Sequence, residues 1–168
     1  MRGGRLATDG DDARRASPDL DSVFRGHRDW LVRRLALIVG DAEEAHDLAQ
    51  ETFVRLTQHW PLPDPSEPAR WLSTVGVRLA IDERRRRRRW GFLALRDTDA
   101  TWAIDADPDL WRALRRLDRR TRAAIVLTTL DGFSQDEVAT MLDAPRGTVA
   151  SWISRGRDRL RAELGTDG

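Results

Sequence analysis

Residues 145–164 contain an apolar repeat that an α-helix places on one side. The repeat has the spacing i, i+4, i+7, i+11 and i+15 and consists of Val149, Ile153, Gly156, Leu160 and Leu164. Between Arg146 and Ala162 the sequence has five arginines and one acidic residue, and Ser151, Ser154 and Arg155 fall opposite the apolar side. We expect the apolar stripe to pack inward and the other face to suit phosphates and base edges.

The residues just upstream predict a second helix that ends shortly before this one. Ser134 and Glu137 have the spacing of a capping box, which begins a helix, and Pro145 prevents that helix from continuing. The result is a helix-turn-helix. Two more helices should complete a four-helix core, with Leu114 and Leu117 on one and Ala123, Val126, Leu127 and Leu130 on the other. The alternative is an ordinary helical hairpin with a solvated arginine face.

The N-terminal half has the pattern of three helices. The first begins near Leu20 and ends near Gly40, and Asp41 caps the second. The core side of the second helix comprises Ala45, Leu48, Ala49, Phe53 and Leu56. Prolines between Pro61 and Pro68 impose a non-helical loop. The third helix begins near Ala69, and its expected buried side comprises Trp71, Leu72, Val75 and Leu79.

Charge divides the chain into domains. Residues 84–89 are six consecutive arginines, whereas residues 90–107 carry four aspartates and one arginine, a net charge of −3. We therefore predict an all-α protein of two small helical domains, residues 18–89 and 108–164, joined by an acidic linker at 90–107. Residues 1–17 have the composition of a disordered tail. The arginine run is either a solvated tail or, as we favour, a nucleic-acid contact.

Several classes of protein are disfavoured by composition. Cysteine is absent, and the three histidines lack ligand spacing, so we expect no metal and no cofactor. No segment approaches the ~20 apolar residues of a membrane span, which favours a cytoplasmic protein without membrane insertion. No P-loop and no Ser/His/Asp arrangement with supporting motifs is present, so we expect no enzymatic activity.

Three motifs carry a resemblance to a known family. They are A-H-D-L-A-Q-E-T-F-V-R-L at 45–56, W-L-S-T-V-G-V-R-L-A-I-D-E-R-R at 71–85, and the pair G-F-S-Q-D-E-V-A-T-M-L and G-T-V-A-S-W-I-S-R-G-R-D-R-L at 132–142 and 147–160. In this order, the motifs resemble those of bacterial sigma factors of the extracytoplasmic-function group. Residues 18–89 then correspond to region 2 and residues 108–164 to region 4.

The resemblance implies a protein that directs core RNA polymerase to promoters. Its polymerase-binding face would lie on the second helix, against the clamp helices of the largest subunit, and comprise Asp47, Gln50, Glu51, Val54 and Arg55. The flap of the second-largest subunit is a further expected contact, and an anti-sigma factor is a candidate partner. A stand-alone helix-turn-helix transcriptional regulator is the alternative function.

The resemblance also implies two sets of DNA contacts. The minus-ten set, which would capture a flipped base and hold the strands open, comprises Asp64, Ser66, Trp71, Arg78, Asp82 and Arg85. The minus-thirty-five set comprises Arg146, Thr148, Ser151, Trp152, Ser154 and Arg155. In that set Ser151, Ser154 and Arg155 would read bases, while Arg146 and Thr148 would contact phosphates.

This chain departs from the family pattern at five positions. Arg78 stands where the family commonly has asparagine, Ala150 where a basic residue is common, and Ser154 where some members have a larger side chain. His46 replaces an acid, and Asp118 replaces a proline. The first three departures bear on the DNA sequence preferred, and none should break the fold.

Overall fold

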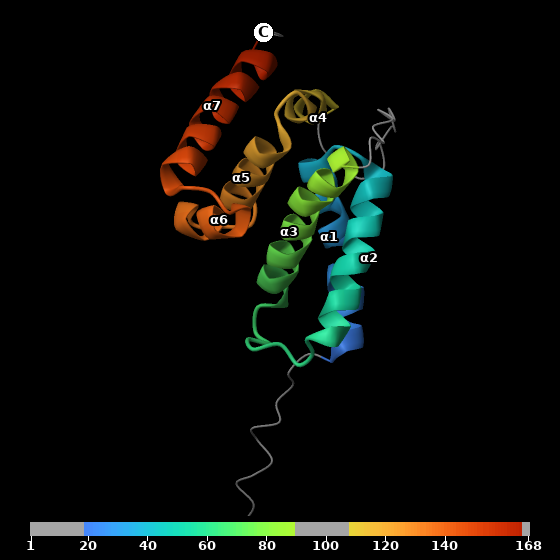
Figure 1. The fold of residues 1–168 in the computed structure, drawn as a ribbon. Coiled ribbons are helices and arrows are strands. Elements are labelled where there is room, and N and C mark those ends of the chain that lie inside the picture. The colour runs from blue at the N-terminus through green and yellow to red at the C-terminus, as the bar shows by residue number, and fades with distance from the viewer. Residues whose placement is uncertain (1–18, 90–107, 166–168) are drawn as a thin grey trace, which may run out of the picture.

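The computed structural model describes residues 19–89 and 108–165, and residues 83–89 by their backbone alone. These two ranges form seven helices and no strand (Figure 1). The predicted tail and acidic linker lie outside the described residues. The helices are α1 (Leu20–Val39), α2 (Ala42–Gln58), α3 (Pro68–Arg89), α4 (Pro108–Arg115), α5 (Arg119–Thr129), α6 (Gln135–Leu142) and α7 (Arg146–Leu164).

Capping side chains set both ends of α1 and the start of α2. The Asp19 carboxylate accepts a bond from the Ser22 amide at 2.6 Å and begins α1. Gly40 ends α1 with a φ of 79°, a left-handed conformation that glycine adopts at low cost. The Asp41 carboxylate then accepts from the Glu44 amide at 2.8 Å and begins α2, so both predicted boundaries are confirmed.

Helices α4–α7 contain the predicted helix-turn-helix. The capping box is present, because Ser134 accepts from the Glu137 amide while the Glu137 carboxylate accepts from the Ser134 amide at 2.8 Å. Asp143 ends α6 in the left-handed conformation, and Pro145 precedes the first residue of α7. Asp118 caps α5 by accepting from the amides of Arg120 and Thr121.

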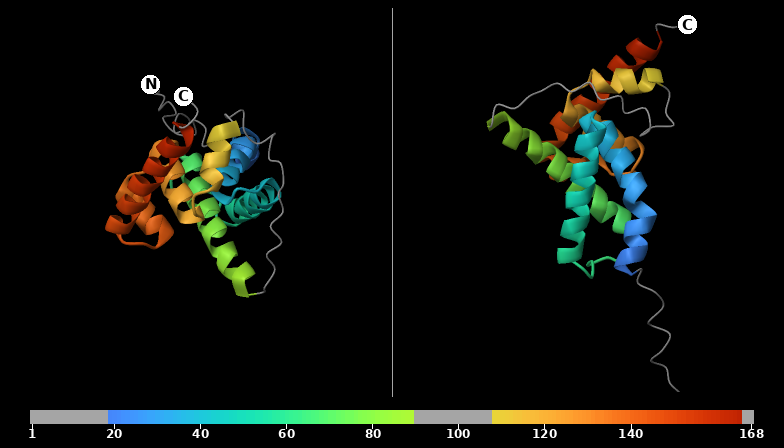
Figure 2. Two further views of the ribbon diagram at one scale, coloured as in Figure 1. Left: turned by 90° about the horizontal axis from the view of Figure 1, so that it is seen from above. Right: turned by 90° about the vertical axis from the view of Figure 1, so that its right-hand side faces the viewer.

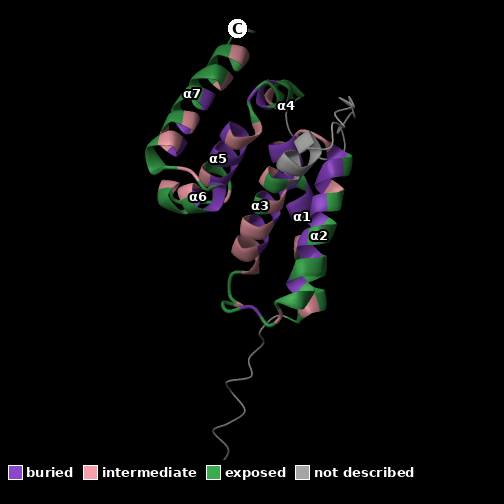
Figure 3. Cartoon of the chain, viewed as in Figure 1, coloured by how far each residue is buried: buried purple, intermediate pink, exposed green. Residues whose placement is uncertain are grey.

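The two groups of helices pack against each other. Helix α1 contacts α5, and α3 contacts both α5 and α6. Buried apolar side chains of both groups form one continuous cluster, which runs from Val23 in α1 to Ile153 in α7. Figure 2 shows α7 on one side of the molecule and α2 on the other, and Figure 3 shows exposed residues along the outer surface of α7.

Two predicted core residues are exposed instead. Leu130 is 50% exposed and Leu164 is 41% exposed, so their assignment to the core is wrong. Leu130 is the C-cap of α5 and Leu164 is the last residue of α7, and both lie at helix ends beyond the packed turns. Of the other stripe residues of α7, Val149, Ile153 and Gly156 are buried as predicted, and Leu160 is half-buried against Leu114, Leu117 and Ile125. No helix in the two described ranges has the length and apolarity needed to cross a membrane.

Candidate nucleic-acid interface

Helix α7 presents the predicted polar face. Ser151, Ser154 and Arg155 are exposed, whereas Thr148 and Trp152 are half-buried at the edge of that face. The Arg155 Nε donates to the Ser151 carbonyl at 3.2 Å, which holds the guanidinium along its own helix. Arg146, also exposed, pairs with Asp136 of α6 at 3.3 Å. The structure thus places all six residues of the minus-thirty-five set on α7, with Ser151, Ser154 and Arg155 on its outer face, Arg146 at its start, and Thr148 and Trp152 at the edge of that face.

Arg120 of α5 supports this face, and sequence reasoning did not single it out. Its Nη1 donates to the Leu142 carbonyl at 2.7 Å, and its guanidinium lies 5.8 Å from the centre of the Trp152 ring. The arginine therefore ties α5 to the end of α6 and to one side of α7. Nothing local in the sequence distinguishes Arg120 from the neighbouring arginines, because its partners are 22 and 32 residues away.

The loop between α2 and α3 places Asp64 and Ser66 in direct contact. The Asp64 Oδ1 accepts from the Ser66 amide at 2.9 Å and from the Ser66 hydroxyl at 2.5 Å. These two bonds, the hydroxyl first, hold the pKa of Asp64 below its ordinary value. The loop therefore presents an exposed carboxylate and an exposed hydroxyl that are hydrogen-bonded to each other in one turn.

Helix α3 continues from this loop. Trp71 lies half-buried in its first turns, with its ring centre 5.8 Å from that of His59 at the end of α2. Arg78 and Asp82 are exposed two and three turns farther along the helix. The backbone of Arg85 is helical, and its side chain lies outside the described residues. Five of the six minus-ten residues are therefore placed, in a row from the loop along α3.

Helix α2 presents a separate mixed-charge face. The five residues predicted there, Asp47, Gln50, Glu51, Val54 and Arg55, are all exposed. Val54 is 52% exposed, and Arg55 pairs with Glu51 at 3.0 Å. Phe24 of α1, 40% exposed, packs edge-on against Phe53 of α2 at 4.8 Å. Phe24 is not among the residues predicted for the polymerase-binding face.

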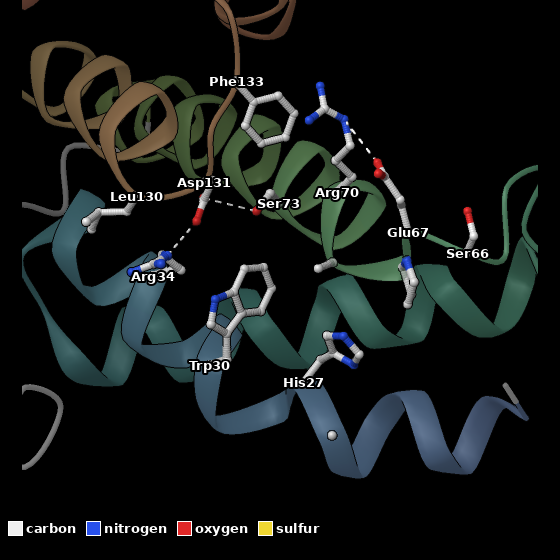
Figure 4. A pocket seen from close by; sticks show the side chains of 13 residues that line it. His27, Trp30, Arg34, Ser66, Glu67, Arg70, Ser73, Leu130, Asp131 and Phe133 are labelled. Atoms are coloured by element: carbon white, nitrogen blue, oxygen red, sulfur yellow. Dashed lines mark hydrogen bonds and ion pairs between the residues drawn. The ribbon is translucent and has the colours of Figure 1, made fainter.

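A pocket of about 640 Å³ lies where the two groups of helices meet. Figure 4 shows His27 and Trp30 of α1 on one wall, with Phe133 and Arg70 across from them. Arg34 pairs with Asp131 at 2.6 Å, and Arg70 pairs with Glu67 at 3.5 Å. The charged groups of the lining are thus matched with each other. Within the described residues, no group of His, Asp and Glu side chains has an arrangement that could hold a metal ion.

Comparison with protein families gives two matches in chain order. Residues 23–90 match the model for sigma-70 region 2, and residues 108–160 match the model for sigma-70 region 4. Together these matches cover well over half of the chain.

Individual proteins of the same kind are similar over most of the chain. The sigma factor SigE of Mycolicibacterium smegmatis is 35% identical over 161 residues, which are 89% of this chain and 63% of that protein. SigL of Mycobacterium tuberculosis is 32% identical over 155 residues, which are 85% of this chain and 87% of that protein. The chain therefore spans less than two thirds of the first relative and most of the second.

A solved structure has the same fold. The sigma factor RpoE of Bartonella quintana, crystallised with the anti-sigma factor NepR, aligns with a TM-score of 0.67 and 23% identity. The alignment covers 89% of this chain and 99% of that one. At this identity the likeness concerns the fold alone. The two region matches, in chain order, place the chain in the sigma-70 family. Because SigL, an extracytoplasmic-function sigma factor, is 32% identical and is covered over 87% of its length, the chain belongs to the extracytoplasmic-function sigma factors of that family.

Proposed function

We propose that this sigma factor binds core RNA polymerase through α2 and reads promoter DNA through α7 and the loop before α3. The observation that carries the proposal is the separation of two polar faces. Helices α2 and α7 lie on opposite sides of the molecule, so the candidate polymerase face and the candidate DNA face are both open to solvent (Figures 1 and 2). The role is one of binding and strand opening, and it requires no catalytic group.

The α2 face supports the polymerase contact. It combines an exposed apolar side chain, Val54, with Asp47 and the Glu51–Arg55 pair around it. Such a patch, apolar at its centre and charged at its rim, is typical of a protein interface. We place the clamp helices of the largest polymerase subunit against it. The flap of the second-largest subunit would bind the C-terminal domain.

The outer face of α7 supports recognition of the minus-thirty-five duplex. Ser151, Ser154 and Arg155 are exposed on a helix, the element that a major groove admits, and the guanidinium of Arg155 would contact a guanine with two hydrogen bonds. Arg146 lies at the start of the helix, where a backbone phosphate would take the place of its partner Asp136. Trp152, held by Arg120, would shape the edge of this surface.

The α2–α3 loop and α3 support the minus-ten contact. Extruding a base from the duplex costs a few kcal/mol, which a fitted pocket can offset. Asp64 and Ser66 provide polar groups for such a pocket, and Trp71 begins the helix that would hold the strand away from its complement. Arg78, Asp82 and Arg85 follow along α3, and the arginines at 84–89 would neutralise phosphates of the opened DNA.

An anti-sigma factor is a further proposed partner. The similar Bartonella quintana sigma factor was crystallised with one. The alternative reading, a stand-alone helix-turn-helix regulator, would need α7 but would leave the exposed face of α2 without a role.

Charge reversal on α2 tests the proposal. We expect Asp47→Arg to weaken binding of core polymerase at least about tenfold, because a reversed charge meets a like charge or loses its complement across the interface, and Gln50→Ala by a smaller factor. Both side chains point away from the core, so helix content should not change. The matched control is Asp29→Arg, an exposed reversal on α1 outside the α2 face. If titrations of core enzyme give the same affinity for both α2 variants and wild type, the proposed face is wrong.

A further inference from the structure

One side of α3 carries two exposed charges of opposite sign. Arg78 and Asp82 follow Trp71 by seven and eleven residues, a spacing that places all three on one side of a helix. The Ser73 hydroxyl and the Ala80 carbonyl, which bond to the C-terminal domain, each lie two residues beyond a member of this row. At 3.6 residues per turn, two residues lead to the opposite side of the helix. The side with Arg78 and Asp82 therefore remains accessible to a ligand.

The side chains of Arg78 and Asp82 have no ion-pair or hydrogen-bond partner within the described residues, and they do not pair with each other. Opposite charges at positions i and i+4 of a helix attract more strongly when the acid comes first. The pair Glu51–Arg55 of α2 has that order and forms at 3.0 Å. In α3 the arginine comes first. The donors of Arg78 and the acceptors of Asp82 are therefore both available to a bound molecule.

The residues one turn before Arg78 offer little to a polar ligand. The Thr74 hydroxyl already donates to the Arg70 carbonyl at 2.9 Å. Val75 is apolar and half-buried. Recognition on this part of the surface would therefore depend on the guanidinium of Arg78 and the carboxylate of Asp82.

A guanidinium and a carboxylate at this spacing match one nucleobase, guanine. Guanine has two acceptors, O6 and N7, on one edge, and arginine contacts both at once. On its Watson–Crick edge it has two donors, N1–H and N2–H, which a carboxylate can accept and which a single strand exposes. Adenine, cytosine and thymine each lack a two-acceptor edge, a two-donor edge or both. Residues i and i+4 are about 6 Å apart along a helix, so Arg78 and Asp82 can flank one base.

A phosphate is a poorer match for the two side chains than a base. The carboxylate of Asp82 would repel a phosphate bound to Arg78, because both groups are negative. The six arginines at 84–89 follow directly in the sequence and have no acid among them. We therefore assign backbone contacts to that run and a base contact to Arg78 and Asp82.

The contact with Asp82 requires an opened strand. In duplex DNA the N1–H of guanine and one N2–H are bonded to cytosine, whereas O6 and N7 remain accessible from the major groove. Arg78 could therefore contact guanine before or after opening, but Asp82 could contact its Watson–Crick edge only afterwards. Binding by both residues would favour the opened strand over the duplex.

We propose that Arg78 and Asp82 form a guanine site, which selects one guanine of the opened minus-ten strand. Arg78 donates to O6 and N7, and Asp82 accepts from N1–H and N2–H of the same base. This inference rests on the proposed function, in which α3 lies along the opened strand, and adds the base that is selected and the atoms that select it. The site couples base recognition to strand opening, because one of its two contacts exists only in the open strand.

Selection from an open-strand DNA library tests which base the site prefers. Holoenzyme made from core polymerase and the full chain would bind DNA with a randomised upstream duplex and a randomised segment held unpaired by mismatches. Wild type should enrich guanine at one unpaired position. Arg78→Ala and Asp82→Ala should both lose that enrichment at the same position, by at least about fivefold. Arg33→Ala, an exposed arginine on α1, is the matched control and should keep it.

Base analogues at the selected guanine test the two contacts separately. In 7-deazaguanine the N7 acceptor is missing, and in inosine the N2 amino group is missing. Each analogue should weaken binding of wild-type holoenzyme at least about fivefold, since each removes a hydrogen bond to a charged group. The 7-deazaguanine penalty should vanish with Arg78→Ala and persist with Asp82→Ala, and the inosine penalty should do the reverse. Penalties that are the same in wild type and both variants would overturn the guanine site.

The same selection separates the guanine site from the proposed function. If wild-type holoenzyme enriches an unpaired sequence but shows no guanine preference that depends on Arg78 and Asp82, the guanine site is wrong and the proposed function stands. If the chain binds core polymerase but the holoenzyme retains no open-strand DNA, the minus-ten part of the proposed function is wrong, and the guanine site with it. Circular dichroism of each variant checks that helix content is unchanged.

Discussion

At the scale of single residues, Gly156 shows how a small side chain sets the position of α7. It is buried, and a Cβ built on it would lie 2.6 Å from both the Ile125 Cδ1 and the Thr121 Cγ2 of α5. Real Cβ atoms do not approach other atoms so closely, and the Thr121 methyl is on a β-branched side chain that has little freedom. The glycine therefore allows α7 to lie directly on α5.

Alanine at this position should destabilise the protein. We expect Gly156→Ala to lower the free energy of unfolding by about 1–3 kcal/mol, the usual cost of overpacking, even though alanine is the better helix former. Gly147→Ala is the matched control, because nothing lies within 4 Å of a Cβ there. The control should be neutral or stabilising by up to about 1 kcal/mol. Equal midpoints for both variants in urea unfolding would contradict the close α5–α7 contact.

Arg155 and Arg146 should differ in what their loss does to DNA binding. Arg155→Ala should remove about 1–3 kcal/mol of discrimination at one base pair, because a guanidinium that reads a guanine carries sequence information. Arg146→Ala should weaken binding to all sequences by a similar factor. Selection of bound sequences by the holoenzyme, made with each variant, checks the difference. Unchanged base preference for Arg155→Ala would remove Arg155 from the base-reading set.

At the scale of elements, the capping box of α6 begins that helix and also contacts the N-terminal domain, because Glu137 pairs with Arg70 of α3. Bonds from the Ser134 amide and hydroxyl, together with the guanidinium of Arg70 in α3, lower the pKa of Glu137 to about 2. The carboxylate therefore begins the first helix of the helix-turn-helix and also contacts the other domain. Because the pKa of Glu137 is lower in the folded protein than in the unfolded chain, the ionised carboxylate stabilises the folded protein.

The pH dependence of stability follows from the direction of this shift. Because the folded pKa of about 2 lies below the ordinary value of 4.5, the contribution of Glu137 is fully present above pH 4.5 and is lost as the pH falls toward 2. Glu137→Gln should flatten the loss of thermal stability in that window. Asp136→Asn, in the same turn of α6 and outside the capping box, is the control. The assignment fails if both variants keep the acid slope of wild type.

The elements were predictable from sequence because their signals are local. Asp41 caps α2 through the amide of Glu44 three residues later, and Ser134 and Glu137 are equally near, so a short window of sequence contains all the interacting groups. The packing between domains was not predictable. Glu44 and Arg119 are 75 residues apart, and nothing near either residue marks it as one half of a buried pair.

In the candidate site, too, features within one helix were predictable from the sequence, whereas contacts between helices were not. Faces that lie on one helix, such as Asp47 and Val54 of α2, follow from helical spacing and are exposed as expected. Arg120, which supports Trp152 from another helix, was missed because its role depends on tertiary structure. Leu130 was placed in the core because periodicity continues to the end of a helix, whereas burial does not.

At the scale of the whole molecule, two domains pack together through a surface that contains buried polar contacts, and the outer faces of α2 and α7 stay exposed. The exposed face of α2 and that of α7 lie on opposite sides (Figure 2). A chain built this way can contact a large protein on one side and duplex DNA on the other. We therefore propose, as the central claim, that this chain confers promoter-specific strand opening on core polymerase.

Promoter opening by reconstituted holoenzyme tests this claim most directly. Purified core polymerase would be mixed with the chain and a genomic fragment library, and melted DNA would be mapped by permanganate reactivity and sequencing. The account predicts melted sites that appear only when both proteins are present, that share paired minus-thirty-five and minus-ten elements, and that are depleted with Asp47→Arg. Duplex binding by the chain alone, with no melted DNA when core polymerase is added, would contradict the account and identify a stand-alone regulator.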